Sequence, residues 1–211
     1  MEKKLITFDL DGTLTTSSSW QKFNELLGIT AEEDQKLFEL YIGGELKYAD
    51  WIGAIASVYR ERGRKVTEAD VEALAQSIEL RPGAREAIDA AANKGYKVII
   101  VSGAIDTIAR TIGKHLGVTT VFSTNEAVYD DNGVLIDLDL MGDERISKFA
   151  MLEAYASEHS FDLKDVVAVG DGGNDIDIFE RTKGIQIGNN EELAKVAWKT
   201  VTSLSEVEAL L

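Results

Sequence analysis

The sequence predicts an α/β fold in which a parallel sheet carries a long helical insertion. Three short apolar runs, each followed by glycine, serine or aspartate, have the character of buried parallel strands: residues 5–8, 97–101 and 165–169. Helical patterns precede the second and third runs, as crossover connections require. Residues 15–80 show helical patterns and no convincing strand. A chain of 211 residues that is 45% hydrophobic is long enough for one core domain with a smaller insertion.

Local signals place the helices and one hairpin. The helix before the second strand starts at Pro82-Gly83 and ends at Lys94-Gly95, and another, over residues 146–158, precedes the third strand. Inside the insertion the apolar spacing predicts helices over residues 20–27, 32–41, 48–62 and 68–78. Residues 121–140 instead alternate around an Asn-Gly pair, which predicts a β-hairpin.

The composition excludes several classes of protein. The absence of cysteine rules out disulfides, thiolate metal sites and cysteine nucleophiles, and it fits a reducing compartment. The apolar run before Asp9 is too short for a signal peptide, and no stretch approaches a membrane span, so we expect a cytoplasmic protein without membrane contact. The net charge of −15 repels nucleic acid, which is therefore not an expected partner. The sequence does not indicate an oligomeric state.

The most informative motif is Asp9-Leu10-Asp11-Gly12-Thr13, which directly follows the first strand. Two carboxylates at the end of a buried strand repel each other and are costly to desolvate, unless a cation neutralises them or a reaction needs them. If the backbone stays extended through Asp11, both side chains point the same way. One carboxylate is then placed to act as a nucleophile and the other to transfer protons.

Three further clusters follow predicted strands or helices. Ser102 and Gly103 end the second strand and open a helix, where a hydroxyl and free amides can hold an anion. Lys148 lies near the start of the helix before the third strand; alone, such a lysine is typical of solvated surface. The acidic, glycine-rich loop of residues 170–175 suits a hard cation held by oxygen ligands. Its alternative interpretation is an ordinary strand-to-helix loop in which Asp175 caps the helix.

In this order, the four clusters resemble the four motifs of the haloacid dehalogenase (HAD) superfamily of phosphohydrolases, and its phosphoserine phosphatase-like subgroup is the nearest. The resemblance covers Leu5 to about Phe179. It implies a Rossmann-like parallel sheet core with an inserted helical cap of that family's first type. We therefore expect residues 1–14 and 81–211 to form the catalytic core and residues 15–80 to form the cap.

The resemblance also implies a Mg²⁺-dependent phosphomonoester hydrolase that acts on a small phosphorylated metabolite. Asp9 would attack phosphorus to give an aspartyl-phosphate, while Asp11 protonates the leaving alcohol and then deprotonates the attacking water. The carboxylates of Asp9 and Asp171 and the carbonyl of Asp11 would hold Mg²⁺. The substrate and phosphate contacts would come from Asp9, Asp11, Thr13, Ser102, Gly103, Lys148 and Asn174. Asp175 would orient Lys148 or a metal-bound water, and Thr13 either buttresses the loop or satisfies local backbone.

The substrate is less well defined. Phosphoserine-specific relatives carry a glutamate nine positions after the nucleophile and an arginine in the cap; here Ser18 and the region of Gly53 take those places. Neutral leaving groups such as polyols or sugars are therefore expected to compete well, with phosphoserine as an alternative. The cap aromatics Trp20, Phe23, Tyr48, Trp51 and Tyr59 are expected to pack the helices. A phosphotransferase or mutase and a non-catalytic phospho-ligand sensor are the remaining alternatives.

Overall fold

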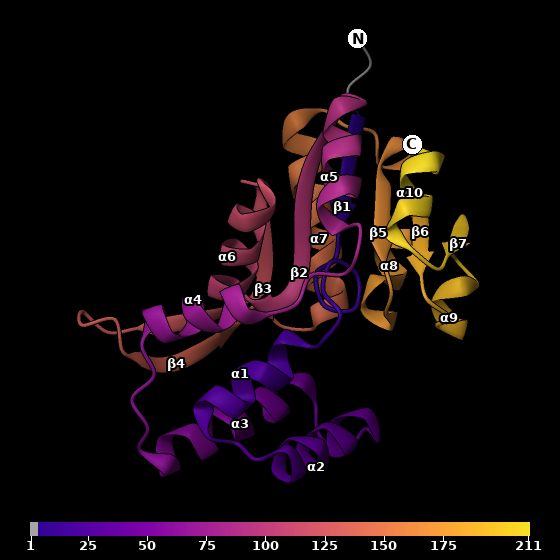
Figure 1. Ribbon diagram of the computed structural model, residues 1–211. Helices are drawn as coiled ribbons and strands as arrows, with labels where there is room; N and C mark the ends of the chain where they lie inside the picture. The colour runs from indigo at the N-terminus through magenta and orange to yellow at the C-terminus, as the bar shows by residue number, and fades with distance from the viewer. Residues whose placement is uncertain (1–3) are drawn as a thin grey trace.

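The structure, a computed structural model, describes residues 4–211 and is built on a seven-stranded sheet (Figure 1). The strand order is β4-β3-β2-β1-β5-β6-β7, and every neighbouring pair is parallel except β3 and β4. The strands are β1 (Lys4–Phe8), β2 (Tyr96–Ile105), β3 (Val121–Tyr129), β4 (Leu135–Leu140), β5 (Val167–Gly170), β6 (Lys183–Ile187) and β7 (Lys199–Val201). The predicted α/β fold is confirmed, and the three expected strands are the adjacent strands β2, β1 and β5.

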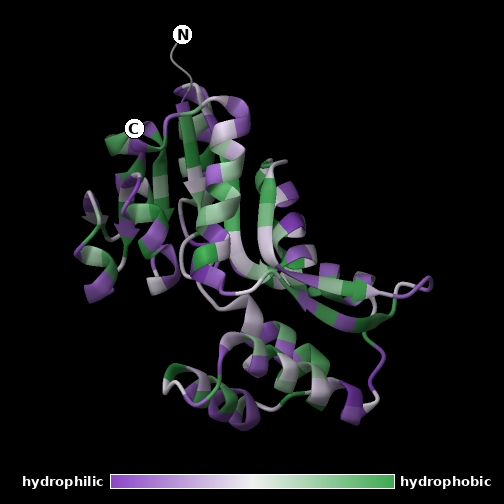
Figure 2. Ribbon diagram, turned by 180° about the vertical axis from the view of Figure 1, so that it is seen from behind, coloured by the Kyte–Doolittle hydropathy of each residue, from purple (hydrophilic) through white to green (hydrophobic). Residues whose placement is uncertain are grey.

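Helices cover both faces of the sheet, because side chains of the central strands alternate between two cores. Ile6 and Ile100 face the core that contains α5 (Ala84–Asn93), α6 (Asp106–Leu116) and α10 (Leu204–Leu210). Leu5 and Ile99 face the core formed with α7 (Glu144–His159), α8 (Ile176–Phe179) and α9 (Glu191–Ala194). Figure 2 shows the resulting apolar character of the central strands. Helices α5 and α7 are the predicted crossover helices.

The insertion after β1 folds into α1 (Ser19–Leu27), α2 (Ala31–Ile42), α3 (Tyr48–Arg62) and α4 (Glu68–Ser77), which confirms the four predicted helices. Helices α1, α2 and α3 form a lobe below the carboxyl ends of the central strands (Figure 1). Phe23, Ile52 and Ile55 are fully buried inside it. Helix α4 instead packs against α6. The lobe therefore faces the edge of the sheet at which a parallel fold gathers its ligands.

Strand β2 and the hairpin of β3 and β4 form the rest of this part of the sheet. Strands β3 and β4 form the predicted hairpin, and the hydroxyl of Tyr59 on α3 donates to the carbonyl of Leu135 on β4 at 3.0 Å. Strand β2 runs on to Ile105 across a register shift that begins at Ser102, so α6 starts at Asp106 and not at the predicted Ser102. Over residues 4–211 no helix is long and apolar enough to cross a membrane.

Candidate active site

The first acidic motif turns sharply at the end of β1. The amide of Asp9 still donates to the carbonyl of Val169 at 2.9 Å, but the amides of Thr13 and Leu14 fold back onto the carbonyl of Leu10. Gly12 has a φ of +74°, and a Cβ at this position would lie 2.1 Å from a carboxylate oxygen of Asp171. Only glycine fits this left-handed turn beside a second carboxylate.

Because of this turn, the backbone is not extended through Asp11. The condition under which the side chains of Asp9 and Asp11 were expected to point the same way is therefore not met. The Asp11 carboxylate accepts hydrogen bonds from the amide and the hydroxyl of Ser19, at 2.8 and 2.6 Å, at the start of α1. The Asp9 carboxylate lies 2.9 Å from Nζ of Lys148. The structure thus gives the two aspartates different surroundings, and Ser19 is a contact that the sequence analysis missed.

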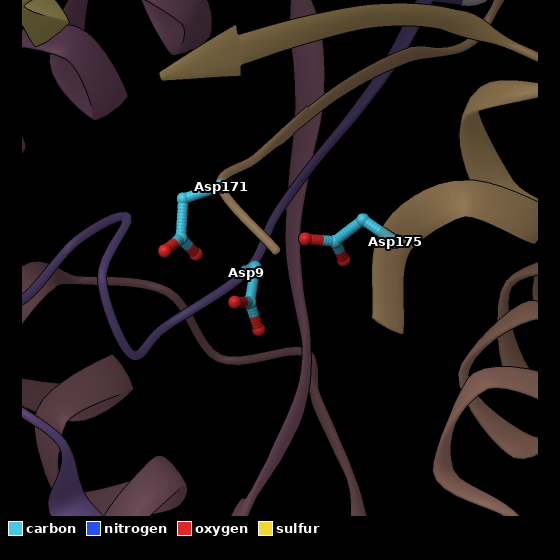
Figure 3. A group of neighbouring side chains, drawn as sticks. All are labelled: Asp9, Asp171 and Asp175. Carbon is cyan, nitrogen blue, oxygen red and sulfur yellow. The ribbon is translucent and has the colours of Figure 1, made fainter. Parts of the chain in front are cut away.

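Three aspartates converge at the carboxyl ends of β1 and β5 (Figure 3). Asp9, Asp171 and Asp175 each offer a carboxylate oxygen, and these oxygens lie within 4.8 Å of one another. Lys148, fully buried, lies 2.5 Å from Asp175 and bridges it to Asp9. The Thr13 hydroxyl donates to Asp171 at 3.2 Å. The surface interpretation of Lys148 is wrong, because the residue is fully buried. Asp175 stands at the N-cap position of α8 without a side-chain cap bond there; its carboxylate pairs with Lys148 and also accepts from the amide of Gly172 at 3.5 Å.

The charges in this cluster do not balance without a cation. Burial lowers the pKa of Lys148, but the carboxylates of Asp175 and Asp9 outweigh it and raise that pKa above its usual range. Burial raises the pKa of Asp171 to about 6, and the charge of Asp9 adds to the rise. One lysine faces three carboxylates, which favours a hard divalent cation with oxygen ligands. The donor set therefore fits the ion that the sequence analysis expected.

Asp11 has the acidity of a proton-transfer group. Burial raises its pKa to about 7, the hydrogen bond from the Ser19 hydroxyl opposes this rise, and the charge of Asp9 supports it. One of its oxygens, Oδ1, is buried without a hydrogen-bond partner among the described residues. A carboxyl group with a pKa near neutrality can give and take a proton at physiological pH.

The raised carboxyl pKa values predict how stability depends on pH. Without a cation, the folded protein binds more protons at Asp11 and Asp171 than the unfolded chain does between about pH 4 and 7. Their stabilising contribution is present below about pH 4 and is lost as the pH rises through 6 to 7. The melting temperature of the metal-free protein should therefore fall from pH 5 to pH 8, relative to that of Asp171→Asn. A wild-type curve that stays parallel to the variant's would contradict this.

The residues that were expected to contact the phosphate lie beside the acidic cluster. Ser102, 1% exposed, and Gly103 lie near the end of β2, where the Ser102 oxygen accepts from the amide of Ala104 at 3.1 Å. Asn174 lies in the loop after β5, and its side-chain amide donates to Glu144 at 2.6 Å. Ser102, Gly103 and Asn174 line the same cavity as Asp9 and Asp11. All four predicted motifs are thus brought together at one edge of the sheet.

The cavity has a volume of about 430 Å³ and is lined on one side by the helical lobe. The lobe contributes Ser18, Trp20, Gln21, Ala31, Asp34, Gln35, Phe38, Tyr41 and Trp51. As expected, the cap aromatics pack in or against the hydrophobic core, and Trp20 and Trp51 also line the cavity.

Sequence reasoning missed the lining residues of α2 and also Glu144. On α2 they recur at helical spacing from Ala31 to Tyr41, and no residue of this helix is buried in a core. This helical spacing was the one feature of the sequence that could have indicated these lining residues. The same spacing is also typical of a helix face that packs against a core, so the sequence alone does not distinguish the two.

Comparisons with known proteins agree with this geometry. Residues 6–180 match the family of haloacid dehalogenase-like hydrolases. A phosphoserine phosphatase of Methanocaldococcus jannaschii is 30% identical over 88% of this chain and 85% of its own length, and one of Lactococcus lactis is 29% identical over 88% and 82%. A solved phospho-aspartyl intermediate analogue of phosphoserine phosphatase superposes with a TM-score of 0.82 at 28% identity, over all of both chains. A substrate-bound phosphoserine phosphatase gives 0.82 at 27%, over 100% and 99%.

Proposed function

Since the chain belongs to the haloacid dehalogenase-like hydrolase family, we propose that it is a Mg²⁺-dependent hydrolase of small phosphomonoesters that forms an aspartyl-phosphate. The observation that carries the proposal is the pairing of two differently placed aspartates. Asp9 contacts the buried Lys148, whereas Asp11 has a pKa near 7 and faces the same cavity. A cysteine-free chain suits a reducing, cytoplasmic setting.

In the first step, an oxygen of Asp9 attacks phosphorus, and Asp11 gives its proton to the oxygen of the departing alcohol. In the second step, the ionised Asp11 takes a proton from water, which attacks phosphorus and releases Asp9. Lys148, the Ser102 hydroxyl, the Gly103 amide and Asn174 hold the phosphoryl oxygens. These groups supply positioning and positive charge, which phosphoryl transfer needs most.

The cation would be held by the carboxylates of Asp9 and Asp171 and the carbonyl of Asp11, with Asp175 beside them. When bound, Mg²⁺ neutralises the converging carboxylates and orients the phosphoryl group. Thr13 fixes Asp171 through its hydroxyl, and Asp175 fixes Lys148. We assign the catalytic core to residues 1–14 and 81–211 and the cap to residues 15–80, whose side chains close the cavity over the leaving group.

Phosphoserine is the second candidate substrate, favoured by the names of the relatives. Its carboxylate has no cationic contact among the residues that line the cavity in the described chain. Ser18 lines the cavity without a charge, while Arg60 and Arg62 form ion pairs with Asp137 and Glu33 at the surface. We therefore rank phosphoserine below substrates that lack a carboxylate.

The test of the proposed function is phosphate release from an aryl phosphate with Mg²⁺ present. Aryl phosphates carry a good leaving group, so their turnover depends little on cap contacts. We expect steady phosphate release. If water is the natural acceptor, an added alcohol should not take up the phosphoryl group in place of water. Stoichiometric transfer to an alcohol would show a phosphotransferase instead, and phosphate binding without turnover would show a sensor.

A further inference from the structure

The cavity is unusual in its charge. Besides the two reacting aspartates, its charged lining residues are Asp34 on α2 and Glu144 at the start of α7. Among the described residues, no lysine, arginine or histidine lines it. A leaving group in this cavity therefore meets carboxylates and no protein cation, apart from the catalytic Lys148 behind Asp9 and Asp175.

Glu144 lines the cavity beside Gly103 and Asn174. Its carboxylate lies over Gly103, so close that a Cβ there would overlap it, and its hydrogen-bond partner is the neutral amide of Asn174. Burial is the largest cause of the raised pKa of Tyr41 and Tyr48 on the cap, and the charge of Glu144 is the second largest. Burial raises the pKa of Glu144, while the charge of Lys148 and the hydrogen bond from Asn174 oppose the rise. A cation on the ligand would stabilise the ionised carboxylate further.

The opposite wall is aromatic. The ring centroid of Trp51 lies 5.5 Å from that of Trp20, 5.2 Å from that of Tyr41 and 6.1 Å from that of Phe38. Aromatic faces attract cations, and tryptophan does so most strongly. Asp34 lies one helical turn before Phe38 on the same face of α2. The wall thus combines aromatic rings with a second carboxylate.

Trp51 also lies at the buried edge of this wall. The residue is 6% exposed, lines the cavity, and its indole N–H has no hydrogen-bond partner in the described structure. A buried indole N–H normally has a partner.

On the basis of the proposed function, we infer that the released alcohol carries an ammonium group, held by Glu144 and Asp34 against the cap aromatics, and carries no carboxylate. The substrate class is the phosphomonoesters of amino alcohols, including those with further hydroxyl groups. Because Asp34 and Glu144 line the cavity, an ammonium-bearing leaving group fits it better than the neutral polyols that the sequence alone suggests.

The test compares matched esters on the Mg²⁺-loaded enzyme. Phosphoethanolamine and 2-hydroxyethyl phosphate differ only in an ammonium for a hydroxyl, and phosphoserine adds a carboxylate to the first. We expect kcat/KM for phosphoethanolamine to exceed that for the hydroxyl ester about tenfold or more, the scale of a charged hydrogen bond with a cation–π contact. Phosphoserine should fall below phosphoethanolamine.

Two variants assign the effect to residues. In Glu144→Gln and in Asp34→Asn, the ammonium-to-hydroxyl ratio of kcat/KM should move toward one, and because it is a ratio, general damage to catalysis cancels. Glu32→Gln changes an exposed residue of α2, the helix that also carries Asp34, and should keep the wild-type ammonium-to-hydroxyl ratio. Should Glu144→Gln fail to fold, Asp34→Asn decides alone.

The outcomes separate this inference from the proposed function. Turnover of an aryl phosphate together with a wild-type ammonium-to-hydroxyl ratio near or below one overturns the inference and leaves the proposed function standing. A preference for phosphoserine over phosphoethanolamine, or a ratio that both acidic variants leave unchanged, overturns it as well. Absence of turnover with every ester, the aryl phosphate included, overturns the proposed function and this inference with it.

Discussion

Replacing Asp9 with asparagine should lower phosphate release by a factor on the order of 10⁴ or more, the scale seen when a covalent enzyme loses its nucleophile. An amide does not attack phosphorus, so no phosphoenzyme should form. The fold should persist, because Lys148 keeps its contact with Asp175 at 2.5 Å and is not left as an unpaired buried charge. Initial rates of phosphate release, measured beside a thermal melt, check both statements.

The matched control for Asp9→Asn is Asp89→Asn, which makes the same chemical change on the exposed surface of α5. The Asp89 variant should keep the wild-type rate and melting temperature. Turnover within a few-fold of wild type in Asp9→Asn would contradict the covalent mechanism, and loss of folding in that variant would contradict the ion-pair argument.

Removal of the divalent ion should abolish turnover almost as completely. Asp9, Asp171 and Asp175 then repel both one another and the incoming phosphate, and among residues 4–211 Lys148 is the one buried cation beside them. A bound divalent cation contributes several kcal/mol to the stabilisation of transition-state charge, so we expect a loss of roughly a thousandfold or more. Chelation followed by titration with Mg²⁺ measures the loss and its recovery.

The site residues make a second, graded prediction about the ion. Asp171→Asn removes one ligand and should shift half-saturation to a higher Mg²⁺ concentration, whereas Asp89→Asn should not. Persistent turnover in the chelated enzyme, or an Asp171 variant with wild-type Mg²⁺ dependence, would show that the acidic cluster does not hold the ion.

The parts of this site that follow from local chemistry were predictable from the sequence. Asp9, Ser102 and Asp171 come near the ends of apolar runs, and parallel strands bring such ends to one edge of a sheet. The four helices of the insertion were predictable because their apolar spacing is regular and Thr30 and Thr67 begin two of them with capping boxes. In both cases a short stretch of sequence carries the whole signal.

The parts that depend on distant contacts were not predictable. The direction of the Asp11 side chain depends on a turn at Gly12 and on Ser19 of the next helix. The burial of Lys148 on α7 depends on two carboxylates that follow β1 and β5. Asp34 and Glu144 line one cavity although 110 residues separate them, and neither stands in a motif. Helical spacing alone does not distinguish a residue that packs from one that meets a ligand.

The covalent role of Asp9 is tested most directly by trapping the intermediate. In Asp11→Asn, the first transfer proceeds slowly with an aryl phosphate because its leaving group needs no protonation, but no carboxylate activates water for the second step. Mass spectrometry of the acid-quenched variant should therefore find one added phosphoryl group on the peptide that contains Asp9. That group should be absent when Asp9 is also replaced by asparagine. A phosphoryl group on any other residue, or its persistence without Asp9, would contradict the mechanism.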